Sequence, residues 1–153
     1  MPKKWITDRS EIDRILNESQ VGSFATINPD GSPHIVPVNY VYHNGKIYFH
    51  CALKGKKLDN IKHNPRVCFS AYIVDRIVLA EKADDTSVRY RSVIVNGIAK
   101  LIDDPVVKMD VLMALTAKYT KGHDTEPPSV ECMHRTGIVE IEIEEITGKK
   151  NVD

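Results

Sequence analysis

Two turn signals lie between three segments rich in β-forming residues, and they restrict the fold more than any other feature of the sequence. Asn28-Pro29-Asp30-Gly31 supplies a proline that presets φ and a glycine that tolerates positive φ, while Asn44-Gly45 is a strong hairpin signal. The flanking segments cover residues 24–27, roughly 34–42, and 47–49, where aromatic and β-branched residues are frequent. The pattern predicts an antiparallel meander of three strands.

The second of these segments is apolar on both faces. Alternation divides its side chains into two sets: Val36, Val38, Tyr40 and Tyr42 on one face, and Ile35, Pro37, Asn39 and Val41 on the other. A strand with one face in water would show polar alternation there. We therefore expect a barrel core on one side and a partner subunit or a ligand on the other.

Three further strands complete the predicted sheet. They cover residues 66–74, 88–102 with a bend at Gly97, and 138–146, where Glu140, Glu142 and Glu144 share a solvated face. Residues 75–87 and 121–131 are predicted loops.

Helices are predicted at three places between these strands. One follows Asp8, which with Glu11 resembles a capping box; the others begin at Lys56 and at Asp104-Pro105. The sum is one mainly β (α+β) domain over residues 1–153. Six antiparallel strands with two or three peripheral helices favour a small barrel over a doubly wound parallel sheet.

The segment from Ile47 to Ile61 joins a strand to a helix through Lys54-Gly55-Lys56-Lys57. A helix that starts after glycine leaves backbone N–H groups and the positive end of its dipole free for an anion. With three lysines beside it, a phosphate is the natural ligand. The alternative is an ordinary strand-to-helix connection with solvated lysines.

The balance of charge argues against several classes of partner. The 153 residues contain 21 basic and 21 acidic side chains, so neither a nucleic acid nor a membrane surface is expected as a partner. No apolar run approaches the roughly 18 residues of a membrane span, and the N-terminus does not resemble a signal peptide, so a cytoplasmic location is expected. The three cysteines form no Cys-x-x-Cys pair, and no metal site is expected.

Three stretches together resemble the FMN-binding split β-barrel superfamily, which includes pyridoxamine 5′-phosphate oxidase. They read V-G-S-F-A-T-I-N-P-D-G-S-P-H-I-V-P-V-N-Y, then N-G-K-I-Y-F-H-C-A-L-K-G-K-K-L-D-N-I-K-H-N-P-R-V-C-F, then Y-R-S-V-I-V-N-G-I-A-K. The similarity runs from about residue 5 to residue 150 and is greatest to the nitroimidazole-resistance (nitroimidazole reductase-like) branch. It implies a homodimer of six-stranded split barrels, with one FMN in each of two clefts between the subunits.

The resemblance also implies which residues contact the flavin. The ring would lie along Val36, Pro37, Val38, Asn39 and Tyr40, and the ribityl chain and ring along His50, Cys51 and Ala52. Lys56 and Lys57 would bind the phosphate. Ser92 stands where the oxidase pattern has a flavin-contacting glutamine. The segment from Thr136 to Lys150 does not match the residues with which the oxidase holds a substrate phosphate, so oxidation of pyridoxine phosphate is not expected.

The predicted function is an FMN-dependent oxidoreductase that reduces small aromatic or nitroaromatic compounds. His50 is the candidate catalytic residue: it could donate a proton or hydrogen bond to reduced flavin or substrate, ligate a haem, or be a hydrogen-bonded histidine at the barrel end. Haem and deazaflavin are alternative cofactors. A non-catalytic flavin or haem carrier, and a cofactor-free structural β-barrel dimer, are alternative functions.

Overall fold

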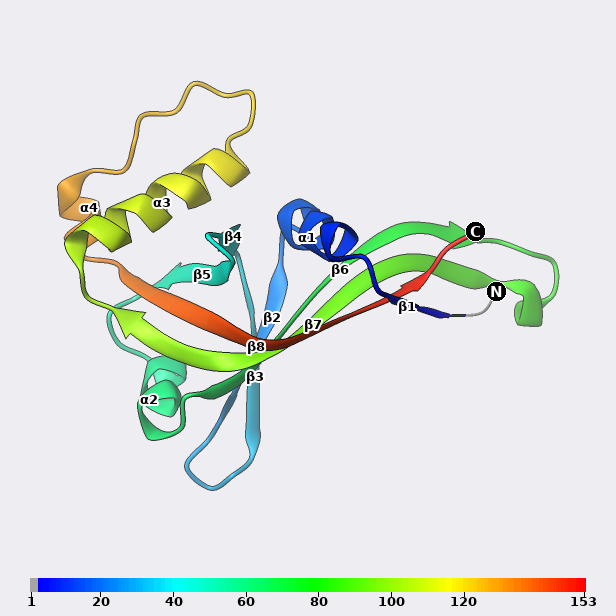
Figure 1. Cartoon of the computed structure of the whole chain (residues 1–153), viewed down its shortest axis with the longest axis horizontal. Helices are drawn as coiled ribbons and strands as arrows, with labels where there is room; N and C mark the ends of the chain where they lie inside the picture. The colour runs from blue at the N-terminus through cyan, green and yellow to red at the C-terminus, as the bar shows by residue number, and fades with distance from the viewer. Residues whose placement is uncertain (1–2) are drawn as a thin grey trace.

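In the computed structural model, which describes residues 3–153, the strands form one eight-stranded antiparallel sheet (Figure 1). The strands are β1 (Lys4–Ile6), β2 (Gly22–Ile27), β3 (Pro33–Val38), β4 (Val41–His43), β5 (Lys46–Cys51), β6 (Arg66–Val78), β7 (Ser87–Ile102) and β8 (Gly137–Asn151). Their order is β3-β2-β6-β7-β8-β5-β4, and β1 pairs with β8. The sheet is not closed, because β3 and β4 lie at its opposite ends. The predicted split-barrel α+β architecture is confirmed, but the number of strands is eight and not six, because β1 was not predicted and the predicted second strand divides into β3 and β4.

Helices cover the sheet at several places: α1 (Arg9–Glu18), α2 (Lys56–His63), α3 (Pro105–Tyr119) and α4 (Val130–His134), with a 3₁₀ turn at η1 (Ala83–Asp85). The predicted caps of α1 and α3 are confirmed. Asp8 accepts a hydrogen bond from the N–H of Ser10, and Asp104 accepts one from the N–H of Val106. The predicted capping box is not confirmed, because the Glu11 side chain binds Lys150 instead. The short helix α4 was not predicted.

The predicted single strand over residues 34–42 is wrong. β3 pairs with β2 and β4 pairs with β5, so the first three predicted strands do not form one meander. Between β3 and β4, the N–H of Tyr40 donates to Tyr119 Oη at 3.0 Å, and its carbonyl accepts from Lys118 Nζ at 2.9 Å. Side chains of α3 thus replace a neighbouring strand at this residue, which local sequence does not reveal.

Two clusters of buried side chains hold the sheet and helices together. The main core contains the edge-to-face pairs Phe24–Phe49 and Tyr40–Phe69, with ring centroids 4.7 and 4.8 Å apart. Val36, Val38 and Tyr42 pack against this core, as their predicted face requires. The second cluster packs α3 and α4 against β4, β5 and β8, and its buried members are Val41, Tyr48, Val111, Leu112, Leu115, Met133 and Ile138.

The predicted bend at Gly97 is confirmed. The pairing of β7 with β8 shifts register between Asn96 and Gly97. A Cβ at residue 97 would lie 2.2 Å from the carbonyl oxygen of Glu142, so no larger residue fits without moving the backbone. The close approach allows two long strands to curl around the core.

A two-stranded arm replaces the ends of the predicted loop at 75–87. β6 continues to Val78, and β7 begins at Ser87, so the hairpin extends beyond the rest of the sheet (Figure 1). Four of its large apolar side chains are at least half exposed: Tyr72, Val74, Ile77 and Leu79. Large exposed apolar surface of this kind commonly marks an interaction site.

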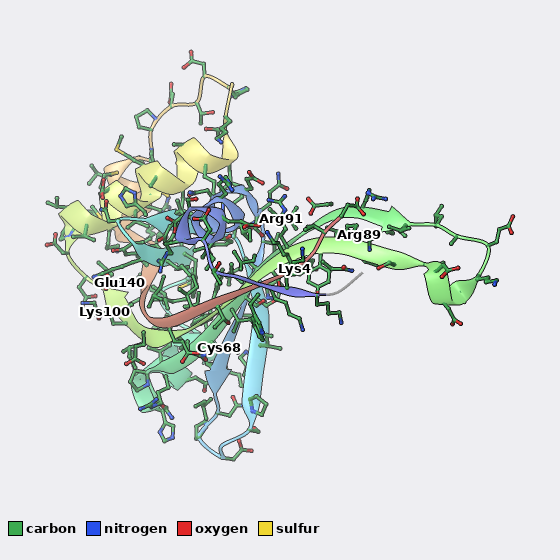
Figure 2. All side chains as sticks on the ribbon, turned by 45° about the vertical axis from the view of Figure 1, so that its right-hand side comes forward. Lys4, Cys68, Arg89, Arg91, Lys100 and Glu140 are labelled. Atoms are coloured by element: carbon green, nitrogen blue, oxygen red, sulfur yellow. The ribbon has the colours of Figure 1, made fainter. Side chains whose placement is uncertain are left out.

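The predicted solvated acidic face of the last strand is wrong at Glu140. Glu142 and Glu144 are exposed, but Glu140 is buried and accepts a hydrogen bond from Tyr48 Oη at 2.9 Å. Lys46 lies 3.3 Å from its carboxylate. Lys100 lies 3.6 Å from it, and Figure 2 labels Lys100 and Glu140. Burial favours a higher pKa for Glu140, but the hydrogen bond and the two lysines lower the pKa below its ordinary value.

Among residues 3–153, no helix has the length and apolar character needed to cross a membrane.

Candidate functional site

A cavity of about 540 Å³ lies between the sheet and the α3–α4 region. Its walls come from the end of β5, the link between β3 and β4, α3, and the segment from residue 125 to 136. The lining residues are Asn39, His50, Leu112, Leu115, Thr116, Tyr119, Thr125, Glu126, Pro128, Cys132 and Thr136. The size is sufficient for a small aromatic compound, and an apolar wall with a few polar groups is typical of ligand sites.

Two of the predicted site residues, Asn39 and His50, meet at this cavity. Asn39 lies in the link between β3 and β4, and its amide donates to the carbonyl of Gln20 at 3.2 Å. His50 is exposed near the end of β5, directly after the buried Phe49, and pairs with Ile138 of β8. Strand alternation explains why Phe49 enters the core while His50 does not.

Cys51 and Ala52 carry the chain from His50 towards α2. Burial raises the pKa of the Cys51 thiol, and the charge of Lys57 partly opposes that shift. Gly137 of β8 packs tightly against this turn, because a Cβ there would lie 2.8 Å from the carbonyl oxygen of Ala52. Sequence reasoning missed Gly137, since a glycine before a strand is also common in ordinary loops.

The helix α2 begins without a side-chain cap. Its N-cap is Gly55, with φ of 154° and ψ of 170°, a backbone conformation that L residues rarely adopt. The first backbone N–H groups of the helix therefore have no capping oxygen from Gly55. Lys56 is exposed and Lys57 half-buried at this end. The predicted strand–glycine–helix geometry is present.

Asn60 fixes the orientation of α2. Its buried amide donates to Thr26 Oγ1 at 3.0 Å and to Asn28 Oδ1 at 2.9 Å. These bonds join the second turn of the helix to β2 and to the turn that follows it. Sequence reasoning missed this residue, although a polar side chain beside the apolar stripe of a helix was the available signal.

The predicted residues of β3 lie on an edge strand. β3 ends the strand order, with β2 as its neighbour in the sheet, so backbone groups along its other side are free to bind a ligand or another chain. Val36 and Val38 are half-buried against the core, whereas Pro37 is exposed on the other face. Of the predicted residues on β3, Pro37 is thus the side chain most open to a ligand, together with the backbone of the free edge.

Ser92 lies on β7, separated from the predicted residues of β3 by β6 and β2. Its hydroxyl donates to the carbonyl of Lys149 at 3.0 Å, and Lys149 also faces it across β7 and β8. His50 faces Ile138, at the other end of β8. Those eleven residues correspond to about 36 Å of strand. Measured along β8, Ser92 and His50 are thus well separated in one chain.

Within residues 3–153, no three His, Cys, Asp or Glu side chains are arranged to hold a metal ion.

Comparisons with known proteins find a family and a shared fold. The family described as pyridoxamine 5′-phosphate oxidase matches residues 8–150. A candidate 5-nitroimidazole antibiotic resistance protein from Bacteroides thetaiotaomicron VPI-5482 superposes with a TM-score of 0.85 at 23% identity, covering 97% of this chain and 87% of that one. No curated protein matches the chain.

Two further structures share the fold over most of their length. The FAD and haem binding protein from Mycobacterium smegmatis has a TM-score of 0.86 at 21% identity, covering 98% of this chain and 74% of that one. The flavocytochrome Anf3 from Azotobacter vinelandii has a TM-score of 0.83 at 21% identity, covering 97% and 70%.

Proposed function

The chain belongs to the pyridoxamine 5′-phosphate oxidase family, and on that premise we propose that it is an FMN-dependent oxidoreductase that reduces small aromatic or nitroaromatic compounds. The structural neighbours named as a FAD and haem binding protein and as a flavocytochrome support a flavin as the cofactor. The neighbour named for 5-nitroimidazole resistance supports the class of acceptor.

The observation that carries the proposal is the start of α2. Gly55 offers no capping side chain, and Lys56 and Lys57 add two positive charges beside the free N–H groups. These groups fit a dianionic phosphate through charge-assisted hydrogen bonds. A phosphate anchored there would leave the rest of FMN to run along Cys51 and Ala52 towards His50. FMN fits this arrangement better than riboflavin, which has no phosphate.

We propose that the site is shared by two copies of the chain. Ser92 and His50 lie at opposite ends of β8, which favours a flavin that takes His50 from one copy and Ser92 from the other. The apolar side chains of the β6–β7 arm, with Ile77 65% and Leu79 86% exposed, offer a surface for that copy. The homodimer and its interfacial site are therefore parts of one proposal.

The protein residues would position the reactants and exclude water. Leu112, Leu115 and Tyr119 form an apolar wall on which an aromatic acceptor can rest. His50 would donate a hydrogen bond or a proton to the acceptor, since its imidazole lines the same cavity. Bound FMN would supply the capacity to accept two electrons and pass them on.

The test of the phosphate site is a comparison of two flavins. FMN and riboflavin are titrated into the cofactor-free protein while flavin fluorescence is recorded. Replacing both Lys56 and Lys57 by alanine should raise the Kd of FMN by about 10- to 100-fold and leave that of riboflavin nearly unchanged. Lys62→Ala, at the other end of α2, is the matched control. An unchanged FMN Kd would contradict the phosphate assignment.

The test of activity is acceptor-dependent oxidation of NADH or NADPH by the FMN-loaded protein, with a panel of nitroimidazoles. His50→Gln should lower kcat by about 100-fold or more if the imidazole donates a proton. Flavin binding without such turnover would favour a carrier instead.

A haem carrier is the second candidate, and it is favoured by the position of His50 on a largely apolar cavity. The absorption spectrum of the freshly purified protein separates the candidates, because flavin and haem absorb at different wavelengths. A colourless protein that takes up neither group would favour a structural dimer.

A further inference from the structure

The residues that line the cavity between β5 and α3 include an acidic side chain but no lysine or arginine. Of its eleven lining residues none is lysine or arginine, and Glu126 carries the only carboxylate. Three threonine hydroxyls and the amide of Asn39 offer neutral hydrogen-bonding groups. Leu112 and Leu115 contribute apolar surface. The cavity therefore has acidic and neutral character throughout, apart from the imidazole of His50.

Three lysines of neighbouring elements do not line the cavity. Lys118 precedes the lining residue Tyr119, but its ammonium group binds the Tyr40 carbonyl at 2.9 Å and lies 3.7 Å from the Tyr40 ring centroid. Lys56 and Lys57 are on α2 and do not line the cavity. An anion that entered would lose its hydration and meet the Glu126 carboxylate without gaining a lysine or arginine partner.

We propose that this cavity is the acceptor site and that it selects uncharged or cationic planar aromatic compounds over anionic ones, with Glu126 setting the preference. The identity of the reaction rests on the proposed function, whereas the selection by charge does not. A flat ring would lie against Leu112 and Leu115, and its substituents would bind the threonine hydroxyls. Compounds that carry a carboxylate or phosphate bind more weakly to the same lining.

Cys132 provides a readout of occupancy that is independent of electron transfer. Its thiol lines the cavity and is exposed. Burial raises the pKa of the thiols of Cys51 and Cys68, which makes both slower nucleophiles. Alkylation of Cys132 by uncharged iodoacetamide, followed by peptide mass spectrometry, therefore reports whether a ligand fills the cavity.

The experiment compares three ligands that share a ring and differ in charge: benzylamine, benzyl alcohol and benzoate. Protection of Cys132 is measured on the protein with and without bound FMN. The pH is 8, because histidine side chains ordinarily titrate nearer neutral pH. We expect the half-protecting concentration of benzoate to exceed that of benzylamine by about 10-fold, with benzyl alcohol between them.

Variants of Glu126 test the origin of the preference. In Glu126→Gln, the half-protecting concentrations of benzylamine and benzyl alcohol should become nearly equal. In Glu126→Lys, benzoate should protect at a lower concentration than benzylamine. Glu81→Gln, on the exposed arm, makes the same change in net charge and should alter nothing. Equal protection by benzoate and benzylamine in the wild type, or an unchanged order in Glu126→Lys, would overturn the proposal.

Turnover separates this proposal from the proposed function. The corresponding 4-nitro compounds are offered to the FMN-loaded protein with NADH or NADPH. Protection in the predicted order without reduction of any nitro compound would overturn the enzyme and leave the selective site. Reduction at equal kcat/KM for all three compounds would overturn the selection and leave the enzyme.

Discussion

The ammonium nitrogen of Lys118 lies 2.9 Å from the carbonyl oxygen of Tyr40 and 3.7 Å from the centroid of its ring. Tyr119 accepts from the N–H of the same residue, so consecutive residues of α3 satisfy both backbone groups of Tyr40. Tyr40 is where the chain passes from one end of the sheet to the other. The C-terminal end of α3 thus completes the hydrogen bonding of the open barrel.

Because of Lys118, the free energy of unfolding is expected to change with pH in the alkaline range. Burial lowers its pKa to about 8, from an ordinary value of 10.5, even though the Tyr40 ring favours the cation. Between these values the unfolded chain binds more protons, so this group adds stability as pH rises from about 8 towards 10.5. The free energy of unfolding in urea should therefore rise less with pH in Lys118→Met than in the wild type.

The exposed Lys121→Met is the matched control for that comparison. Because tyrosines and thiols also titrate in this range, the measured quantity is the difference between each variant and the wild type. A Lys118→Met profile parallel to the wild type would contradict the prediction.

Asn60 is expected to position the phosphate end of the flavin site. Asn60→Ala removes two buried hydrogen bonds and should lower the free energy of unfolding by about 2–4 kcal/mol. The start of α2 then loses its fixed orientation, so the Kd of FMN should rise while that of riboflavin changes little. Fluorescence titration of both flavins measures this, and the exposed Asn17→Ala is the control. An equal rise in the Kd of both flavins would show that Asn60 contributes only to folding.

Glu140 is expected to contribute stability that is lost in acid. Its folded pKa lies below the ordinary value of 4.5, since the bond from Tyr48 and the nearby lysines outweigh the effect of burial. This contribution is present above 4.5 and disappears as pH falls through the lowered pKa. Glu140→Gln should therefore be less stable than the wild type at pH 7, by about 1–3 kcal/mol, with the difference shrinking in acid.

Urea unfolding between pH 7 and pH 3 measures the effect of Glu140→Gln. Glu142→Gln, on the exposed part of the same strand, should match the wild type throughout. A constant difference across the whole range would show that packing, and not charge, explains the loss.

The arm is expected to hold the proposed dimer together. Replacing Ile77 and Leu79 by serine removes the two most exposed aliphatic side chains of the arm hairpin. The variant should elute as a monomer in chromatography with light scattering, keep its far-UV circular dichroism, and lose FMN uptake, because the proposed flavin site combines His50 of one copy with Ser92 of the other. Glu81→Ser on the same arm should remain dimeric. A dimeric serine variant with normal FMN uptake would contradict both assignments.

Local signals in the sequence predicted much of the fold. Asp8 and Asp104-Pro105 marked helix starts, Asn44-Gly45 joined β4 to β5, and Gly97 marked the bulge. Each depends on a preference of a few adjacent residues, so neighbours in the sequence are sufficient to reveal it. The start of α2 at Lys56 belongs to the same class.

The features that sequence reasoning missed are set by distant residues. The break near Tyr40 depends on Lys118 and Tyr119, and the burial of Glu140 depends on Tyr48 from a neighbouring strand. Periodicity assigned Glu140 to water because alternation cannot distinguish a solvated face from one covered by side chains of distant segments. The acidic cavity was not predicted for the same reason, since Glu126 lies in a segment whose position only the folded chain defines.

The position of β8 has a consequence for the order in which the chain can fold. β8 pairs with β1, β5 and β7, and in the strand order it is the element that joins the β4–β5 hairpin to the remainder of the sheet. During synthesis that hairpin is complete about 90 residues before Gly137 emerges, and it has no strand to pair with in the interval. We therefore expect folding to be largely post-translational, and a chain ending before Gly137 to expose the β5 edge to aggregation.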